Sequence, residues 1–99
     1  MTSSSHTPNL KRITRIMKAL ANENRLALYL SIREAQMLTV DRAPCFVNEI
    51  AADLRIGPPT VSHHLKELER ADLIITERIG KRVAARLNEG TANLVKGIL

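Results

Sequence analysis

The sequence predicts a mainly α-helical domain with a small β-hairpin, arranged as a winged helix-turn-helix of about five helices and a two-stranded wing. Three observations support this fold class. Aromatic residues make up only 2% of the 99 residues, so the core has to be aliphatic, which suits helices better than a β-sandwich. Apolar residues recur at helical spacing over the first two thirds of the chain. Two short β-like runs around a glycine turn then follow.

The N-terminal part predicts a tail and two helices. Residues 1–9 are rich in Ser and Thr and predict a flexible tail, so we expect residues 10–99 to form the folded domain. The first helix is expected over residues 10–20, with Lys11, Arg12, Arg15 and Lys18 largely off its apolar face. The second is expected to follow an N-cap at residue 22 and to end near residue 37.

The middle of the chain predicts two short helices joined by a tight turn. Residues 38–45 contain an Asp and a Pro and break the helical pattern. A third helix is expected over residues 46–54, with apolar residues at i, i+3, i+4 and i+7. Gly57 can then cap a fourth helix, and Pro58 is tolerated at its first position because an N–H is not needed there. This helix is expected to end near residue 70.

The C-terminal part predicts a wing and a last helix. Residues 73–78 and 83–87 are β-like and flank a basic turn at residues 79–82, so we expect a hairpin. Residues 89–99 predict a short helix with Ala92, Val95 and Leu99 facing inward.

Charge and composition narrow the classes of function. The net charge of +5 suggests an anionic partner, and nucleic acid is the first candidate. No apolar run approaches the roughly 20 residues that a membrane-spanning helix needs. Residues 1–8 lack the apolar stretch of a signal peptide, and a single cysteine excludes an internal disulfide. We therefore expect a cytoplasmic protein with no membrane partner.

The helix-turn-helix and the hairpin together predict a DNA-binding surface. Near its start, the fourth helix carries side chains that are short or polar at the tip, as a helix entering the major groove requires: Pro59, Thr60, Ser62, His63 and Lys66. The hairpin offers cations that suit contacts with phosphates beside the groove: Arg78, Lys81 and Arg82.

Four stretches are typical of one group of bacterial repressors: residues 20–26 (LANENRL), 61–65 (VSHHL), 71–74 (ADLI) and 78–81 (RIGK). With them the chain resembles, over about residues 10–88, the ArsR/SmtB family. The resemblance implies a homodimer, with its first and last helices at the dimer contact. It also implies binding of double-stranded DNA at an inverted-repeat operator and release when an effector binds. It places Thr60, Ser62, His63 and Lys66 at base or phosphate contacts.

The chain departs from the family pattern at several positions. Asp72 stands where the family often has glycine, and a left-handed turn there is more tolerable for Asp than for most residues. Ala84 and Ala85 stand where aromatic residues are frequent, which predicts a thinner wing. Metal-sensing members often carry a Cys-x-Cys pair where this chain has Phe46 and Asn48. The last helix has no His or Asp, so we expect no metal and no cofactor.

Several interpretations stay open for single residues. Adjacent histidines on a helix point about 100° apart, so we expect His63 to contact DNA and His64 to pack against a neighbouring helix. Cys45 is either a small apolar residue or a redox sensor whose thiolate is favoured by a helix start. The basic residues of the first helix either contact flanking phosphates or are simply solvated.

The leading functional hypothesis is a sequence-specific transcriptional repressor, built from a DNA-binding and dimerisation domain over residues 10–99. The alternative is a winged-helix module for protein–protein interaction, an adaptor or antirepressor, because one fold serves many functions. The basic wing argues against that alternative. An enzyme is not expected, because the sequence has no phosphate loop, no paired catalytic carboxylates and no nucleophile–base spacing. The effector stays open among an oxidant, an organic molecule, an unusual metal site and none.

Overall fold

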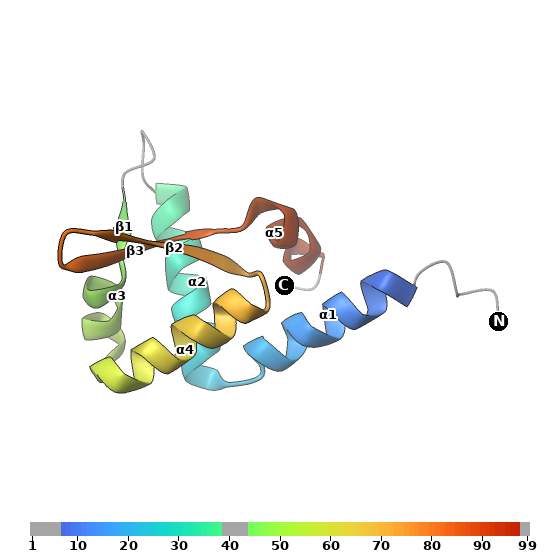
Figure 1. Cartoon of the computed structure of the whole chain (residues 1–99), viewed down its shortest axis with the longest axis horizontal. Coiled ribbons are helices and arrows are strands. Elements are labelled where there is room, and N and C mark those ends of the chain that lie inside the picture. The colour runs from blue at the N-terminus through green and yellow to red at the C-terminus, as the bar shows by residue number, and fades with distance from the viewer. Residues whose placement is uncertain (1–6, 39–43, 98–99) are drawn as a thin grey trace.

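The computed structural model describes residues 7–38 and 44–97, and in them the predicted winged helix-turn-helix is confirmed (Figure 1). These residues form five helices and a three-stranded antiparallel sheet of order β1-β3-β2. The elements, in chain order, are α1 (Thr7–Leu20), α2 (Glu23–Leu38), β1 (Cys45–Phe46), α3 (Val47–Leu54), α4 (Pro58–Arg70), β2 (Ile74–Ile79), β3 (Arg82–Leu87) and α5 (Glu89–Lys96).

Helix boundaries follow the caps that the sequence predicts. The Asn22 side chain accepts a hydrogen bond from the Arg25 backbone N–H at 3.0 Å, which satisfies one of the unpaired donors at the start of α2. Gly57 is the N-cap of α4 and is followed by proline at the first helical position. Helix α1 begins at Thr7, three residues before the predicted start, because the proline that follows fits a first turn. Leu99, expected to face inward, lies outside the described residues.

The two-stranded wing is confirmed as the β2–β3 hairpin, and the sheet holds one strand more than the sequence predicted. Strand β1 pairs with β3 and adds a third strand, with Cys45 opposite Ala85 and Phe46 opposite Ala84. A two-residue strand is too short to show an alternating pattern, so the sequence predicted helix and loop there instead. The partners on β3 are both buried alanines.

The turn after α4 confirms the expected left-handed residue. Asp72 has a φ of 58°, and its N–H donates to the Glu69 carbonyl at 2.9 Å. The next N–H, of Leu73, donates to the Leu68 carbonyl at 3.0 Å. These bonds satisfy carbonyls that the helix end would leave unpaired and send the chain directly into β2.

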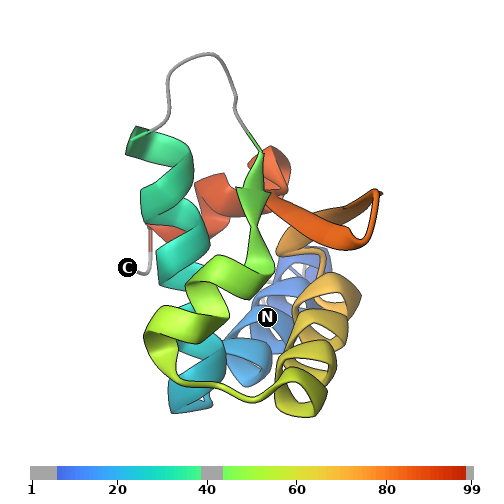
Figure 2. The same cartoon turned by 90° about the vertical axis from the view of Figure 1, so that its left-hand side faces the viewer.

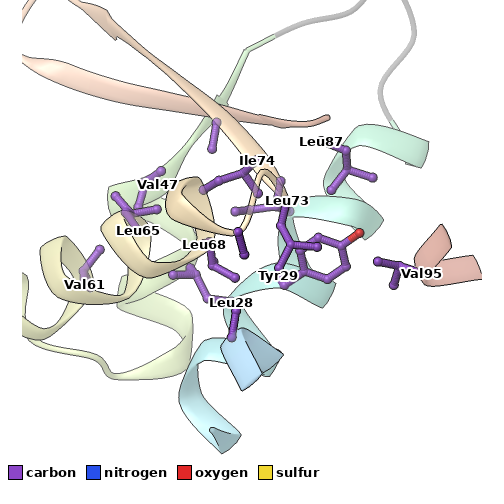
Figure 3. Close-up of a cluster of buried hydrophobic side chains, with 14 of the residues drawn as sticks. Leu28, Tyr29, Val47, Val61, Leu65, Leu68, Leu73, Ile74, Leu87 and Val95 are labelled. Atoms are coloured by element: carbon purple, nitrogen blue, oxygen red, sulfur yellow. The ribbon is translucent and has the colours of Figure 1, made fainter. Parts of the chain in front are cut away.

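The core is aliphatic and centres on α2. Leu28 and Tyr29 are fully buried and lie against Leu68 of α4 and Leu73 at the start of the wing (Figure 3), and Ile32 is a fully buried member of the same cluster. Because α2 is covered by the other elements, it serves as the scaffold that holds α3, α4 and the sheet in place.

The two ends of the molecule differ. Figures 1 and 2 show the N-terminus of α4, helix α3 and the tip of the β2–β3 hairpin together at one end. Helices α1 and α5 lie toward the other end, where Arg12 donates a hydrogen bond to the Thr91 hydroxyl at 3.1 Å. The described residues extend 50 × 30 × 22 Å. One end therefore presents the predicted DNA-contacting residues, and the other presents the helices expected at the dimer contact.

Replacing Tyr29 with Phe should stabilise the fold. The Tyr29 side chain is fully buried, and its hydroxyl has no hydrogen-bond partner among the described residues. Figure 3 shows this oxygen directed toward the side where Leu87 and Val95 lie. A buried, unpaired hydroxyl is penalised by lost hydration, so its removal should raise the free energy of unfolding by about 1 kcal/mol. Calorimetry at fixed protein concentration should show a rise in Tm of ~4–8 °C.

Tyr29→Leu is the matched control for that experiment. It removes the same hydroxyl but also most of the ring, so the cavity left behind should lower Tm below that of the parent protein. A Tyr29→Phe protein that melts at a lower temperature than the parent would contradict the prediction, because it would mean that the hydroxyl is stabilising.

Candidate nucleic-acid interface

Helix α4 presents one polar face to solvent and buries the other. Val61, His64, Leu65 and Leu68 are buried against the core. All five residues that the sequence predicted for the groove-facing surface are exposed on the opposite side: Pro59, Thr60, Ser62, His63 and Lys66. The helix is thus anchored through residues 61–68, while the exposed side chains near its N-terminus are accessible to a partner.

The wing brings its cations to the same end of the molecule. Gly80, with a φ of 63°, makes the turn between β2 and β3, a conformation that favours glycine. Arg78, Lys81 and Arg82 around this turn are all exposed. Positive charge therefore lies beside the exposed face of α4, as the sequence predicted.

Arg82 differs from the other wing cations because it contacts α3. Its guanidinium lies over the Phe46 ring, 3.7 Å from the ring centroid, and pairs with the Glu49 carboxylate at 3.5 Å. Both members of the ion pair are more than half exposed, so the pair itself is worth little. The stacking on Phe46 gives this cation a defined position that the sequence did not predict.

A groove of about 560 Å³ separates α3, the start of α4 and the wing. Its walls are mostly aliphatic, and its polar lining residues are Asn48, Ser62, Lys81 and Arg82. Two wing cations and one predicted groove-facing residue therefore meet at a single concave surface. In the sequence, Asn48 stands out only as one position of the missing metal site. No local pattern could place it beside Ser62 and Lys81, since they come from three different elements.

The two adjacent histidines are separated as the helical period predicts. His63 is exposed, whereas the His64 side chain is buried and neither of its ring nitrogens has a hydrogen-bond partner among the described residues. Burial is the largest cause of a lowered pKa for His64, and electrostatic interaction with Arg25 and with His63 lowers it further. His64 is therefore neutral in the folded protein at pH 7 and belongs to the core rather than to the surface.

The buried histidine should make the fold sensitive to acid. An unfolded histidine has a pKa of about 6.5, and that of folded His64 is lower. Between these two values only the unfolded chain holds the proton, so the free energy of unfolding falls as the pH drops below about 6.5 and is unaffected above it. The slope contributed by one such group approaches 1.4 kcal/mol per pH unit. Denaturant titrations at pH 7.5, 6.5 and 5.5 should show this loss.

His64→Gln should flatten the dependence in this range, because the replaced group no longer titrates. His63→Gln is the matched control: it changes the exposed neighbour and should leave most of the dependence in place. Equal slopes for the parent and for His64→Gln would show that His64 is not the group responsible.

Cys45 lies where β1 runs into α3 and is only half-buried. Burial is the main cause that raises the pKa of its thiol, and the Glu49 carboxylate raises it further. The protonated thiol therefore predominates at neutral pH, whereas a helix start alone would favour the thiolate.

Among the described residues, no three His, Cys, Asp or Glu side chains are grouped so that they could hold a metal ion. In the same part of the chain, no helix has the length and apolar character needed to cross a membrane.

Comparison with known proteins identifies relatives of this arrangement. Residues 37–76, from the end of α2 into β2, match the family described as bacterial regulatory protein, arsR family. The chain is also similar to the HTH-type transcriptional repressor SmtB of Mycobacterium tuberculosis, with 36% identity over 72 residues. That match covers 73% of this chain and 47% of the relative, so the chain spans about half the length of the curated relatives it matches.

Two solved structures share nearly the whole fold. One is the homodimeric winged helix-turn-helix DNA-binding domain of a possible ArsR-family transcriptional regulator from Mycobacterium bovis, with a TM-score of 0.73 and 25% identity over 96% of this chain and 82% of that one. The other is the transcriptional repressor BigR from Xylella fastidiosa, with a TM-score of 0.72 and 26% identity over 99% and 93% of the two chains.

Proposed function

Because the chain carries a winged helix-turn-helix of the ArsR family of bacterial regulatory proteins, we propose that it is a sequence-specific, DNA-binding transcriptional repressor that works as a homodimer and leaves its operator when an effector binds. The observation that carries the proposal is the surface formed by the exposed half of α4 and the wing. A helix of this kind fits the major groove, and a basic hairpin beside it can reach the neighbouring backbone.

We assign direct base contacts to the middle of the exposed face of α4. Ser62 and His63 are both exposed there, about 100° apart around the helix, and both carry hydrogen-bonding groups. Thr60, Lys66 and Pro59 flank them toward the two ends of the same face. Base-edge contacts carry sequence information, so we expect these positions to determine which operator is chosen.

We assign phosphate contacts to the wing and the groove beside it. Arg78, Lys81 and Arg82 supply positive charge, and Asn48 can donate a hydrogen bond from the facing helix. Phosphate contacts fix the register of a protein on the duplex without reading its sequence. They should therefore raise the affinity for every DNA and make it fall steeply with salt.

We propose that the homodimer forms through α1 and α5. Leu10 and Met17 of α1 are 64% and 54% exposed and stand seven residues apart, which places them on one face of the helix. Exposed large apolar side chains that line up on one helix favour pairing with a second copy. Helix α1 lies toward the end of the molecule opposite the tip of the wing (Figure 1), so two copies joined through it can present both α4 helices to one duplex. The similar Mycobacterium bovis domain is described as homodimeric.

Fluorescence anisotropy with DNA from upstream of the protein's own gene tests the proposed function. In near-physiological salt and excess nonspecific competitor, we expect a Kd on the order of 10⁻⁸ M or tighter. We also expect two half-sites about one helical turn, or a multiple of it, apart. A protein that binds no DNA selectively but recovers one stoichiometric protein partner from a lysate would overturn the proposal in favour of an interaction module.

We propose that Cys45 is not a peroxide sensor. Burial and the Glu49 carboxylate raise the pKa of its thiol and so lower the fraction of the reactive thiolate at neutral pH. Peroxide should therefore fail to release the protein from its operator, and a Cys45→Ser protein should bind that operator like the parent. Peroxide-dependent release that Cys45→Ser abolishes would restore the redox hypothesis.

A further inference from the structure

We infer that the groove between α3, α4 and the wing binds a small organic anion with an apolar body, and that such an anion competes with operator DNA. The competition rests on the proposed function, but the binding site does not. The groove measures about 560 Å³, which lies within the range of small-molecule sites. It is the concave surface on which side chains from α3, α4 and the wing converge.

The floor of the groove suits an apolar body. Ala51, Val61 and Leu65 are buried members of the core that also line the groove, so their positions are fixed by packing. Ile56 and Val83 extend the aliphatic wall on two sides. A sugar–phosphate strand needs positive charge and hydrogen-bond donors from this surface and leaves most of such a wall unused. A ligand with a hydrocarbon or aryl body would use it.

The rim of the groove suits a single negative head group. Lys81 and Arg82 contribute two positive charges, and Asn48 and Ser62 add neutral hydrogen-bonding groups. None of the described residues that line the groove is acidic. The Glu49 carboxylate pairs with Arg82 at 3.5 Å from outside the lining. Two cations against one carboxylate leave a net positive rim, which favours an anion such as a carboxylate.

Overlap with the DNA-contacting surface gives the anion a regulatory consequence. Ser62, Lys81 and Arg82 belong both to the groove and to the surface proposed for DNA. An anion seated there neutralises the rim and occupies the space that a phosphodiester strand would enter. Release of the repressor would then be direct displacement, and no change in the shape of the dimer would be needed.

Binding is tested first without DNA, by nuclear magnetic resonance titration of the isotope-labelled protein. Three probes separate charge from body: benzoate has both, benzamide has the ring without the charge, and acetate has the charge without the ring. We expect benzoate to shift the backbone amide signals of Ala52, Lys81 and Val83 in a saturable way, with a Kd at least tenfold lower than that of benzamide or acetate. Equal effects of benzoate and either control, or no saturable shift at these residues, would overturn the site.

Two variants locate the probe. Ala52 is exposed and lines the groove, so Ala52→Leu should fold normally, fill the space and abolish the benzoate response. Ala21→Leu, at an exposed position in the turn between α1 and α2, is the matched control and should leave the response unchanged. Lys81→Gln, which removes a cation without filling space, should weaken benzoate severalfold. A benzoate response that survives in both groove variants would place the probe elsewhere and overturn the proposal.

Competition is then measured by anisotropy on the operator. If one molecule excludes the other, benzoate at ten times its Kd should raise the apparent Kd for DNA about tenfold, and benzamide at the same concentration should raise it at most about twofold. Benzoate that saturates the groove while leaving operator affinity unchanged would overturn the competition. A protein that binds no operator would contradict the proposed function instead, and the DNA-free titration would still decide whether the site exists.

Discussion

Replacing Ser62 and His63 together with alanine should lower the affinity for the operator at least about 30-fold and leave nonspecific DNA binding within about twofold. The two side chains are exposed on the face of α4 proposed for the major groove. A good base contact is worth about 1–3 kcal/mol of discrimination, so the loss of two corresponds to about 2–6 kcal/mol. Because every 1.4 kcal/mol is a factor of ten in affinity, the expected loss starts near 30-fold.

The same double variant should keep its fold, because neither side chain is buried and no hydrogen bond to either is part of the core. Its Tm should stay within about 2 °C of the parent, since exposed substitutions change stability little. Asn24→Ala, at an exposed polar position on α2, is the control and should change neither operator affinity nor Tm. Unchanged operator binding by the double variant would show that α4 does not read the bases.

Lys81→Ala should give the opposite pattern from the α4 variant. A lost phosphate contact weakens binding to all sequences alike and lowers the magnitude of the salt slope by about one. Anisotropy at four salt concentrations, with operator and with random DNA, therefore separates the two halves of the surface. A Lys81→Ala protein that lost affinity only for the operator would mean that the wing reads bases.

Features set by neighbouring residues could be predicted from the sequence. The cap at Asn22, the Gly57–Pro58 start of α4 and the left-handed Asp72 all depend on local backbone chemistry, and the structure has each of them. The division between exposed His63 and buried His64 follows from the helical period alone. These rules need no knowledge of the rest of the fold.

Features that join distant segments could not be predicted in this way. Strand β1 exists because Cys45 and Phe46 lie next to the buried alanines of β3, roughly 40 residues away in the chain. The position of Arg82 over Phe46 depends on that same pairing, which brings the wing beside the start of α3. The groove needs α3, α4 and the wing at once, so Asn48 could not be recognised as part of it. Apolar periodicity predicts which faces are buried and leaves open which faces meet.

Replacing Leu10 and Met17 with glutamate should convert the protein to a monomer and lower its operator affinity at least about 100-fold. Both side chains are more than half exposed in the single chain, so the replacements should not unfold it. Across a symmetric contact, however, four carboxylates would be brought together with little solvent, and like charges in such a place are strongly unfavourable. A monomer places only one α4 on the DNA and loses the gain from linking two sites, which is typically 10²–10⁴-fold.

Sedimentation at micromolar concentration measures the first effect, and anisotropy on the full operator and on one half-site measures the second. The monomer should bind the half-site as the parent does and show no gain on the full operator. Met37→Glu with Leu38→Glu is the matched control, because these residues are 77% and 75% exposed but lie at the end of α2. If the control pair dissociates the dimer and the α1 pair does not, the second copy sits on the end of α2. The proposed arrangement, with both wings directed away from the α1 contact, would then be wrong.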